Sequence, residues 1–514
     1  MLPMPALLDW TGHALIDVGI ATICRMVGKT DPCSLTTDDL GAAAKEMDRY
    51  YFSGALNSYL TCVFMNSEYV QPETGANKAT SRKLYAERNL YAFRSPPDSN
   101  LEGEICAFSG LPASHRIHRG QMPMLTGEEV LNFFPNGAGG LNINGAYLTA
   151  LQALPLGGRR SEGRLFIAHA DNPNLTLALA GSFLEDNRRL ITLAMSNSLP
   201  NKQGVDESLP REQASWDTVK KRAKYPDAKS PFSLIADDLL RTLGDAKLLN
   251  SVAGPVSLTI YWLSSSGQGP SLEIYPVPSN LLNFLRRVEQ KGHARVFRAL
   301  VARSWQLIDV NPVAKTKGKK QPESRGPQLG GPGRSTNRLL ADLFSVYQAG
   351  FIDLHRAATF LRRHLLLSSK TFDIERSGRW GLAEFFLEEV LSMSPDRIKQ
   401  IKDFADKLAE YISTRNDKGF FQQVVYAKFN RDVRNALVKA QRNELLSKNS
   451  LLFTLDQYLA VFEADDAVGA INWSLIRDLI SIRLMEKLHE SGWLTPEKLS
   501  SETEEENELV TTGE

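Results

Sequence analysis

The chain has 514 residues, of which 42% are hydrophobic and 23% are charged, and its formal net charge at pH 7 is +1. This length and composition predict a globular protein with two or more domains and exclude a chain dominated by disorder. The sequence has no apolar run of about 18 residues and no signal-peptide core, so we expect neither a membrane-spanning nor a secreted protein.

The first predicted element is a helix within residues 10–28, where apolar residues recur at helical spacing and Gly28 supplies a stop. The pattern Thr-Gly-x-x-x-x-Asp-x-Gly begins at Thr11 and places Asp17 and Gly19 inside this helix. We interpret Asp17 and the glycines of the pattern as architectural. Contact with RNA or with a neighbouring subunit is the alternative for these residues.

Residues 35–60 are predicted to be rich in helix, and residues 71–100 form a polar stretch in which cations alternate with aromatic side chains. Such a mixture suits contact with a nucleic-acid backbone together with stacking on bases. A solvated helix and loop is the alternative interpretation. The residues concerned are Lys78, Arg82, Lys83, Arg88 and Arg94, with Tyr85, Tyr91 and Phe93 between them.

A segment rich in glycine and asparagine, residues 106–169, is the most distinctive part of the chain. Its glycines permit positive φ angles and close approach of the backbone, and its asparagines place hydrogen-bonding groups on turns. Apolar side chains between them can anchor the loops to a core, so we predict a rigid platform that is presented for binding and not for catalysis. The residues are Gly137, Gly139, Gly140, Gly145, Asn136, Asn142, Asn144, Phe133, Phe134, Leu141 and Ile143.

This platform resembles the large subunit of the type I-B CRISPR Cascade, an RNA-guided surveillance complex. The chain departs from the family pattern at three expected cysteines, whose positions hold Ser109, Asn144 and Tyr147. The matching residues are Cys106, Asn132 to Pro135, Gly137, Gly140, Leu141, Ile143, Gly145, Ala150 to Gly157, Gly163 to Leu165 and His169.

The missing cysteines have a chemical consequence. A structural zinc site needs four ligands in a tetrahedral array, and one thiol with a hydroxyl, an amide and a phenol cannot supply them. We therefore expect a degenerate zinc-knuckle-like platform that is metal-free and is held by hydrogen bonds and packing. Zinc binding by Cys106, His115 and His118 is the alternative, and it lacks a fourth ligand.

From residue 164 to residue 180 the side chains alternate in character as they do in strands, so strands are predicted there. Residues 183–195 are predicted as mixed structure. A polar insertion at residues 197–230 contains clustered lysines and is interpreted as a DNA contact or as a solvated loop. Residues 256–263 and 272–277 predict a β-hairpin, because β-branched and aromatic runs flank a turn rich in Ser and Gly. This hairpin is also similar to the Cascade large subunit.

The strongest local charge lies in residues 282–341, which hold thirteen Lys or Arg against three acidic residues. We predict a basic helix over residues 283–305 and a flexible basic segment over residues 310–338 that lacks the apolar residues for a core. Because neutralised phosphates release counterions, these cations predict salt-dependent binding to nucleic-acid backbones. The candidates are Arg286, Arg287, Lys291, Arg295, Arg298, Lys315, Lys317, Lys319 and Lys320.

From residue 339 onwards the pattern predicts an α-helical bundle. Its helices are expected at residues 339–350, 353–367, 381–391, 395–411, 421–446, 455–462 and 473–488. In the helix at 421–446, five cations fall within about 140° of arc at 100° per residue. We interpret this stripe as a contact for single-stranded DNA, with surface solvation as the alternative. The five are Lys428, Arg431, Arg434, Lys439 and Arg442.

The bundle is similar to the small subunit of Cascade, which in this family is also produced from a start inside the large-subunit reading frame. Met393 precedes Ser394 and Pro395, a pair that opens helices. A start at Met393 would release residues 393–514 as a separate fragment, and its use is a hypothesis. A single protein band after expression of the reading frame, unchanged when Met393 is substituted, would refute it.

No residue pattern predicts catalysis. The eight histidines lie outside the metalloprotease, nuclease and paired-carboxylate patterns, and Gly28-Lys29-Thr30 lacks the preceding glycine and strand of a P-loop. His169 and Asp171 suggest acid-base chemistry, but structural hydrogen bonding is favoured because they have no partner serine. The four cysteines show no disulfide spacing, which indicates a reducing cytoplasm.

Overall we expect an α+β protein with a mixed N-terminal domain at residues 1–338, a helical bundle at 339–500 and an acidic, disordered tail at 501–514. We expect a cytoplasmic subunit without enzymatic activity, cofactor or metal, and the resemblance implies its role. Such a subunit recognises a short protospacer-adjacent motif in duplex DNA and helps to open the duplex for the guide RNA. Amide side chains can read base edges, and the candidates here are Gln121, Asn136, Asn142, Asn144 and Gln268.

The implied partners are CRISPR RNA, target double-stranded DNA, the backbone, guide 5′-end and small subunits of Cascade, and a recruited helicase-nuclease. A transposon-associated Cascade, in which transposition proteins take the place of the nuclease, is the alternative within the same class. A nucleic-acid-processing enzyme with an unfamiliar active site and a free-standing DNA-binding scaffold are the alternatives from other classes.

Overall fold

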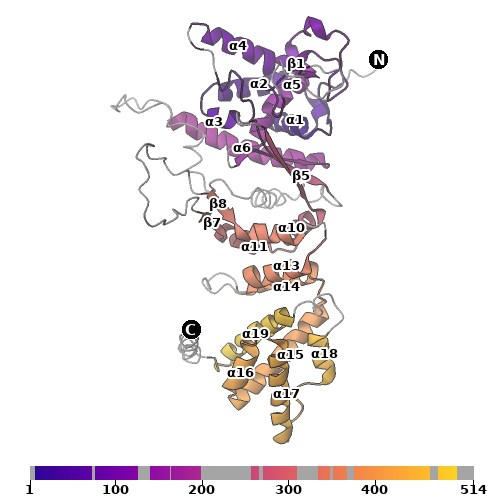
Figure 1. Cartoon of the computed structure of the whole chain (residues 1–514), viewed down its shortest axis with the longest axis vertical. Coiled ribbons are helices and arrows are strands. Elements are labelled where there is room, and N and C mark those ends of the chain that lie inside the picture. Colours follow the sequence, from indigo (N-terminus) through magenta and orange to yellow (C-terminus); the bar gives the residue numbers. More distant parts are fainter. Residues whose placement is uncertain are drawn as a thin grey trace, which may run out of the picture. The chain divides into compact units, whose positions relative to one another are not determined.

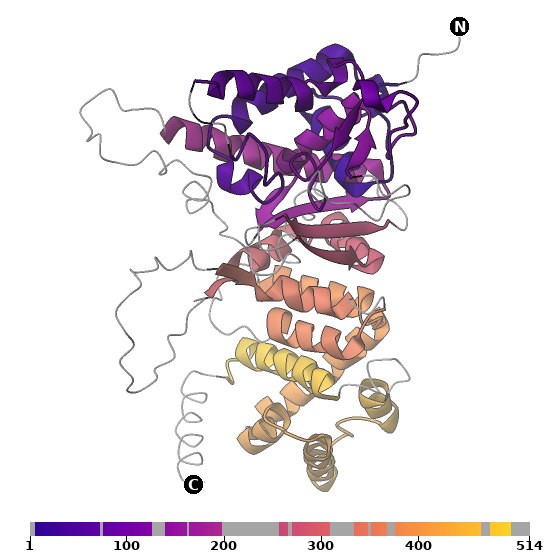
Figure 2. The same cartoon turned by 45° about the horizontal axis from the view of Figure 1, so that its top comes forward.

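The computed structural model of the chain divides into two compact units (Figures 1 and 2). The first comprises Met1–Gln290 and Leu300–Ala341, and the second comprises Lys291–Ala299 and Asp342–Glu514. The residues that the structure describes are 6–71, 74, 76–125, 139–161, 164–197, 256–265, 270–308, 334–347, 351–366, 376–463 and 473–494.

The first unit combines helices with small antiparallel sheets (Figure 1). Its helices are α1 (Ala14–Met26), α2 (Thr37–Tyr51), α3 (Asn57–Leu60), α4 (Lys78–Asn89), α5 (Gly145–Ala153), α6 (Pro173–Asn197) and α10 (Ser279–Gln290). Short 3₁₀ helices are η1 (Pro32–Ser34), η2 (Ala92–Arg94), η3 (Ser99–Leu101) and η4 (Leu154–Gly157). The strands are β1 (His115–Ile117), β2 (Leu141–Ile143), β3 (Arg159–Ser161), β4 (Arg164–Ala170), β5 (Leu258–Ser264), β6 (Ser271–Val277), β7 (Trp305–Ile308) and β8 (Arg334–Asn337). This mixture confirms the predicted α+β class.

Helix α1 lies at the centre of the first unit's core, and its prediction is confirmed. It packs against α5, α6, η4 and β4, and its apolar face is buried. Gly28 follows its end with a φ of +75°, a conformation that favours glycine. Within the helix, a Cβ on Gly19 would lie 2.1 Å from the carbonyl oxygen of Ala150 in α5. The close contact between the two helices therefore requires glycine at this position.

The larger sheet has the strand order β3-β4-β5-β6, with all neighbours antiparallel. The pairing of β5 with β6 confirms the predicted hairpin, whose turn residues 266–269 lie outside the described part of the chain. Successive strand residues point to opposite faces, and Phe166 and Ile167 of β4 are both buried. Phe166 meets Phe183 of α6, with 6.1 Å between ring centroids. Strand β4 is therefore covered on both of its faces.

The strand prediction for residues 164–180 is correct only for β4. Residues from Pro173 belong to α6, which continues to Asn197 through the segment predicted as mixed structure. Leu175, Leu177 and Leu179 alternate like strand residues, but Leu175, Leu179 and Phe183 also share one face of a helix, and all four are buried. Burial of that face favours a helix over a strand in this segment. The rest of the insertion predicted at 197–230 lies outside the described residues.

The basic helix predicted over residues 283–305 is wrong, because the chain forms two helices there, α10 and α11 (Ala294–Arg303). Gly292 between them has a φ of +78°, which breaks the helical path. Trp305 already belongs to β7, which pairs with β8. The flexible segment predicted for 310–338 is therefore wrong at its end, where pairing with β7 orders residues 334–337. Residues 309–333 lie outside the described part of the chain.

The described elements of the second unit are helical. They are α12 (Arg338–Tyr347), α13 (Leu354–Phe360), the π-helical turn η6 (Leu361–Leu366), α14 (Arg376–Glu389), α15 (Pro395–Arg415), α16 (Lys418–Val425), α17 (Asn430–Leu446), α18 (Leu455–Phe462) and α19 (Trp473–Glu490). Helices α11 and α12 each have residues in both units. Helix α15 packs against α18 and α19, and α16 packs against α17 and α19. The predicted start at Pro395 and the predicted extent of α18 are confirmed. The acidic residues 501–514 lie beyond the described residues.

The single helix predicted over residues 421–446 is wrong, because α16 and α17 are separated by a turn at residues 426–429. Phe429 is extended, with φ −130° and ψ 149°, and its amide donates to Oδ2 of Asp432 in the first turn of α17 at 3.3 Å. Apolar spacing continues across this turn without Gly or Pro, so periodicity could not reveal the break. Among the described residues, no helix is both long enough and apolar enough to span a membrane.

Candidate nucleic-acid interface

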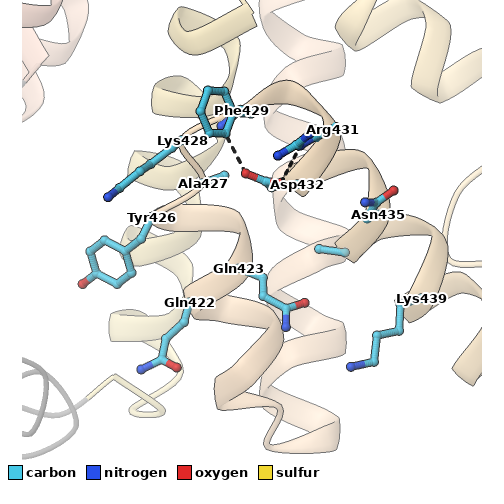
Figure 3. A pocket seen from close by; sticks show the side chains of 11 residues that line it. Gln422, Gln423, Tyr426, Ala427, Lys428, Phe429, Arg431, Asp432, Asn435 and Lys439 are labelled. Atoms are coloured by element: carbon cyan, nitrogen blue, oxygen red, sulfur yellow. Dashed lines mark hydrogen bonds and ion pairs between the residues drawn. The ribbon is translucent and has the colours of Figure 1, made fainter. Parts of the chain in front are cut away.

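A groove of about 540 Å³ lies along α16, α17 and the turn between them (Figure 3). The break in the helix creates it, because side chains from both helices now border one space. The buried residues Ala427 and Ala436 are part of its lining. The larger lining residues are Gln422 and Gln423 from α16, Tyr426, Lys428 and Phe429 from the turn, and Arg431, Asp432, Asn435 and Lys439 from α17.

Three of the five predicted stripe cations, Lys428, Arg431 and Lys439, line this groove, and their side chains are exposed. Asp432 lies 3.6 Å from Arg431 and is the acidic lining residue. Lys428 and Lys439 form no ion pair with any residue that the structure describes. Arg434 and Arg442 are also exposed on α17 but lie outside the groove lining. The groove thus collects an excess of positive charge.

Two aromatic rings of the groove are unusually open to solvent. Tyr426 is 51% exposed and Phe429 is 58% exposed, whereas large aromatic side chains are mostly buried in folded proteins. The guanidinium carbon of Arg431 lies 5.3 Å from the centroid of the Phe429 ring, within the range of a cation–π contact. The sequence prediction did not include these rings, because their exposure depends on the break between the helices.

Helix α19 holds the turn in place. Arg477 donates from Nη1 to the carbonyl oxygen of Ala427 and pairs with Asp478 at 2.6 Å. Asp478 is buried and also pairs with Arg362 at 2.5 Å. Charge-assisted hydrogen bonds of this kind are stronger than neutral ones. The position of the groove's aromatic residues is therefore fixed by a network that reaches from the turn through α19 to η6.

This combination of side chains suits an unpaired nucleic-acid strand. Cations neutralise phosphates, exposed rings stack on bases, and the amides of Gln422, Gln423 and Asn435 can bond base edges. Stacking tolerates any base, and backbone contacts depend strongly on salt. The geometry therefore predicts single-strand binding with weak sequence preference.

The other described cations of the prediction lie on α10 and α11. Arg287, Lys291, Arg295 and Arg298 are exposed, and Arg286 is partly buried. The opposite face of α10 buries its leucines, so this helix is amphipathic with its charge directed outward. The four lysines predicted further on, Lys315, Lys317, Lys319 and Lys320, lie outside the described residues.

The loop around Cys106 is closed by hydrogen bonds among residues 106–111. The amide of Phe108 lies 3.5 Å from the sulfur of buried Cys106, and the Cys106 backbone bonds Gly110 and Leu111 at 3.1 and 2.8 Å. Ser109, at the first missing-cysteine position, accepts from the amide of Leu111 at 3.4 Å. Within the described residues, no group of three or more His, Cys, Asp or Glu side chains could hold a metal ion.

The other two missing-cysteine positions also have structural partners. Asn144 caps α5, because its Oδ1 accepts from the amide of Ala146 and its Nδ2 donates to the carbonyl of Pro112, both at 3.0 Å. The Tyr147 hydroxyl accepts from the amide of Asp9 at 3.0 Å. The Tyr147 bond joins the platform to the N-terminal segment, and the two Asn144 bonds lie within the platform.

The amide side chains predicted to read a short DNA motif differ in how far their hydrogen-bonding groups are already engaged within the protein. Asn142 accepts from Arg116 Nε at 3.0 Å and donates to Glu104 at 2.9 Å, so both ends of its carboxamide are engaged, as they are in Asn144. Gln121 accepts from the amide of His118 at 3.0 Å. Asn136 and Gln268 lie outside the described part of the chain. Base reading by Asn142 or Asn144 would require their internal bonds to open.

Buried Asp17 binds the N-terminal turn to the sheet, which explains the pattern noted in the sequence. Its Oδ1 accepts from the amide and hydroxyl of Thr11, both at 2.8 Å, and its Oδ2 accepts from the amide of Gly12 at 2.9 Å. His169 Nε2 lies 3.1 Å from the same Oδ2. Burial raises the pKa of Asp17, but these hydrogen bonds outweigh burial and hold the pKa below its usual range. The geometry matches the structural role predicted for Asp17 and His169.

The aromatic residues of the stretch at 71–100 are partly buried and pack against the core of the first unit. Tyr85 donates its hydroxyl to the carbonyl of Gly120 at 3.2 Å, and Tyr91 and Phe93 pack against the core of the first unit. Arg82 lies with its guanidinium carbon 4.5 Å from the Phe52 ring. The rings are therefore occupied by packing, which favours the solvated-surface interpretation of this stretch over base stacking.

Comparisons with protein-family models, with curated proteins and with solved structures find no match to this chain.

Proposed function

We propose that the chain is the large subunit of a type I-B CRISPR Cascade complex and that it binds nucleic acid without cleaving it. The observation that best supports nucleic-acid binding is the α16–α17 groove, which is lined by three cations and two exposed aromatic rings. The residue pattern of the platform at 106–169 favours this complex over a general single-strand binder. In this proposal the chain acts in the cytoplasm with CRISPR RNA, target DNA and the backbone, guide 5′-end and small subunits.

The platform at 106–169 and the α16–α17 groove have different tasks in this proposal. The platform recognises the protospacer-adjacent motif in duplex DNA, and the groove holds the strand that is displaced when guide RNA pairs with its target. A protein that binds the unpaired strand better than the duplex shifts the equilibrium toward the open state by that difference in affinity. Because Asn142 and Asn144 are engaged internally, the preferred motif readers are Gln121, Asn136 and Gln268.

Bond breaking is assigned to a recruited helicase-nuclease. In the alternative, a transposon-associated Cascade, transposition proteins are recruited instead and the groove has the same task. The genes beside the coding sequence discriminate between the two. A nucleic-acid-processing enzyme is the rival from another class, and incubation of the pure chain with labelled DNA, RNA and Mg²⁺ tests it. Turnover that one substitution abolishes would favour that rival.

An internal start at Met393 would give a fragment that begins directly before α15. The fragment would keep the contacts of α15 with α18 and α19 but would lose the pair between Arg362 and Asp478. Asp478 would retain Arg477 as its partner, so a buried carboxylate would not be left without a counter-ion. The α16–α17 groove would be present in both products.

Co-expression with the neighbouring genes tests the assignment. Affinity purification through this chain should yield a complex that contains CRISPR RNA, and the complex should bind a duplex only when the guide matches it. Replacement of Asn136 together with Gln121 should weaken binding to the target while RNA still co-purifies. Absence of RNA from the purified material would contradict the assignment, and equally tight duplex binding without guide RNA would favour the free-standing scaffold.

A further inference from the structure

The last described residues of the chain include Trp493, which contacts the helix that forms one wall of the groove. After α19, Trp493 donates from Nε1 to Oδ1 of Asn416 at 2.9 Å, and its ring lies 5.7 Å from that of Phe421 in α16. The amide of Leu494 bonds the carbonyl of Leu488 at 3.0 Å, so the chain is anchored at this point. Phe421 directly precedes Gln422 and Gln423, which line the groove. The residues that follow Leu494 therefore start from the helix that forms one side of the groove.

The sequence that follows carries the charge opposite to that of the groove. Residues 495–514 contain a single cation, Lys498, and a run of acids concentrated between Glu502 and Glu508. The groove holds three cations and one acid among its lining residues. Opposite charges on one chain attract at low and moderate ionic strength, and salt screens this attraction. The acids are Glu497, Glu502, Glu504, Glu505, Glu506, Glu508 and Glu514.

The segment is long enough to reach the groove. Eight residues lead from Leu494 to Glu502, and an extended chain covers roughly 3.3 Å per residue, which gives about 26 Å. A helix with its side chains is about 10–12 Å across, so the far side of α16 lies well within this distance. A tethered ligand also has an effective concentration on the order of millimolar. Weak individual charge pairs are therefore sufficient for substantial occupancy.

We propose that the acidic segment Glu502–Glu508 of the chain itself binds in the α16–α17 groove and competes there with nucleic acid. Its carboxylates pair with Lys428, Arg431 and Lys439 in place of phosphates. An isolated nucleotide or a short anion then meets an occupied groove, whereas a long strand displaces the segment because it makes more contacts. The competition rests on the proposed nucleic-acid binding, but the contact within the chain does not.

The first experiment compares three full-length proteins by anisotropy of a fluorescent single-stranded oligonucleotide at low salt. In one variant, Glu502, Glu504, Glu505, Glu506 and Glu508 are all changed to Gln. A control variant has the same charge change at five other exposed acids, namely Glu87, Glu102, Glu388, Glu410 and Glu463. The segment variant should bind about 3- to 10-fold more tightly than the wild type, and the control should gain clearly less. Equal gains in the two variants would overturn the competition.

The second experiment does not involve nucleic acid. A fluorescein-labelled peptide of residues 495–514 is titrated with the five-Gln variant, whose own segment no longer competes. The peptide should bind, and the same variant with Lys428→Gln, Arg431→Gln and Lys439→Gln should bind it at least about 5-fold more weakly. If the peptide does not bind, or binds both proteins equally, the contact is refuted. Peptide binding without oligonucleotide binding would preserve the contact and refute the proposed function instead.

Discussion

The residues at which α1 touches its neighbours show how closely the first unit is packed. Gly19 leaves no room for a methyl group beside Ala150, and Gly157 would place a Cβ 1.9 Å from the hydroxyl of Thr22. Asp17, two residues before Gly19, fixes the start of the helix through Thr11, Gly12 and His169. The Thr-Gly-x-x-x-x-Asp-x-Gly pattern is therefore explained by a carboxylate that satisfies backbone amides and a glycine that permits helix contact.

Replacement of Gly19 with Ala should destabilise the protein. The added methyl group would collide with the backbone of α5, and overpacking of this kind typically costs about 1–3 kcal/mol. Urea unfolding followed by circular dichroism measures the change in unfolding free energy. Gly419→Ala in α16 is the matched control, because its Cβ would meet only Asp417 Oδ1 at 3.6 Å and alanine favours a helix. Equal stability of the two variants would contradict the close packing at Gly19.

Two imidazoles make the stability of the first unit dependent on pH. Burial lowers the pKa of His13 and His115, and it outweighs the opposite effects of Asp17 and Asp98. Below pH about 6.5 the unfolded chain therefore binds more protons at these positions than the folded chain, so the free energy of unfolding must fall as the pH falls. The free energy of unfolding falls on acidification because the pKa values of both imidazoles are lower in the folded state than in the unfolded chain.

The urea midpoint should accordingly be lower at pH 5.5 than at pH 7.5. His13→Gln combined with His115→Gln should reduce this difference, because neither position then titrates. His355→Gln, at an exposed histidine, is the control substitution. A midpoint that stays constant or rises on acidification of the wild type would show that burial does not control these two groups.

Elements with a clear local signal could be predicted from the sequence, and elements decided by tertiary contacts could not. The hairpin β5–β6, the start of α15 at Pro395 and the extent of α18 follow from turn residues, an N-cap serine and apolar spacing. Helix α6 was missed because its leucines fit both a strand and a helix, and burial against β4 decides between them.

The break between α16 and α17 was missed for a related reason. The apolar spacing runs through the turn, which is held by Arg477, a residue distant in sequence. Asp432 is a local signal for the start of α17, because its carboxylate accepts a hydrogen bond from the amide of Phe429 three residues earlier. Without the structure, a single Asp at this position is weak evidence for a helix start. The cations of the groove could therefore be predicted as a stripe, whereas its two exposed rings and its shape could not.

At this turn, Tyr426→Ala and Phe429→Ala should each weaken binding of a single-stranded oligonucleotide by about 5-fold or more. Stacking on an aromatic ring contributes on the order of 1–3 kcal/mol per base, and both rings are exposed, so folding should be little affected. Binding of a duplex should change less, because its bases are already stacked on each other. Leu446→Ala, at an exposed residue of α17 outside the groove lining, is the control for anisotropy measurements. Loss of duplex and single-strand binding to the same extent would argue against stacking.

In the proposed function, the whole molecule divides its tasks between a hydrogen-bonded platform in the first unit and a charged, aromatic groove in the second. The chain lacks three of the four cysteines that the platform of the resembled family carries, and hydrogen bonds from Asn144, Tyr147 and Ser109 occupy those positions. We therefore expect chelators to leave the platform intact. The proposed role requires the groove to hold an unpaired strand by charge and ring surface, with cleavage left to a partner.

The most direct measurement is the salt dependence of single-strand binding by the wild type and by a variant with Lys428→Gln, Arg431→Gln and Lys439→Gln. Each phosphate contact contributes about 0.7 to the slope of log affinity against log salt concentration. The variant should lose at least about 10-fold in affinity at low salt, and its slope should be smaller by about 2 because three phosphate contacts are lost. Equal affinities and equal slopes for the two proteins would contradict the proposed role of the groove.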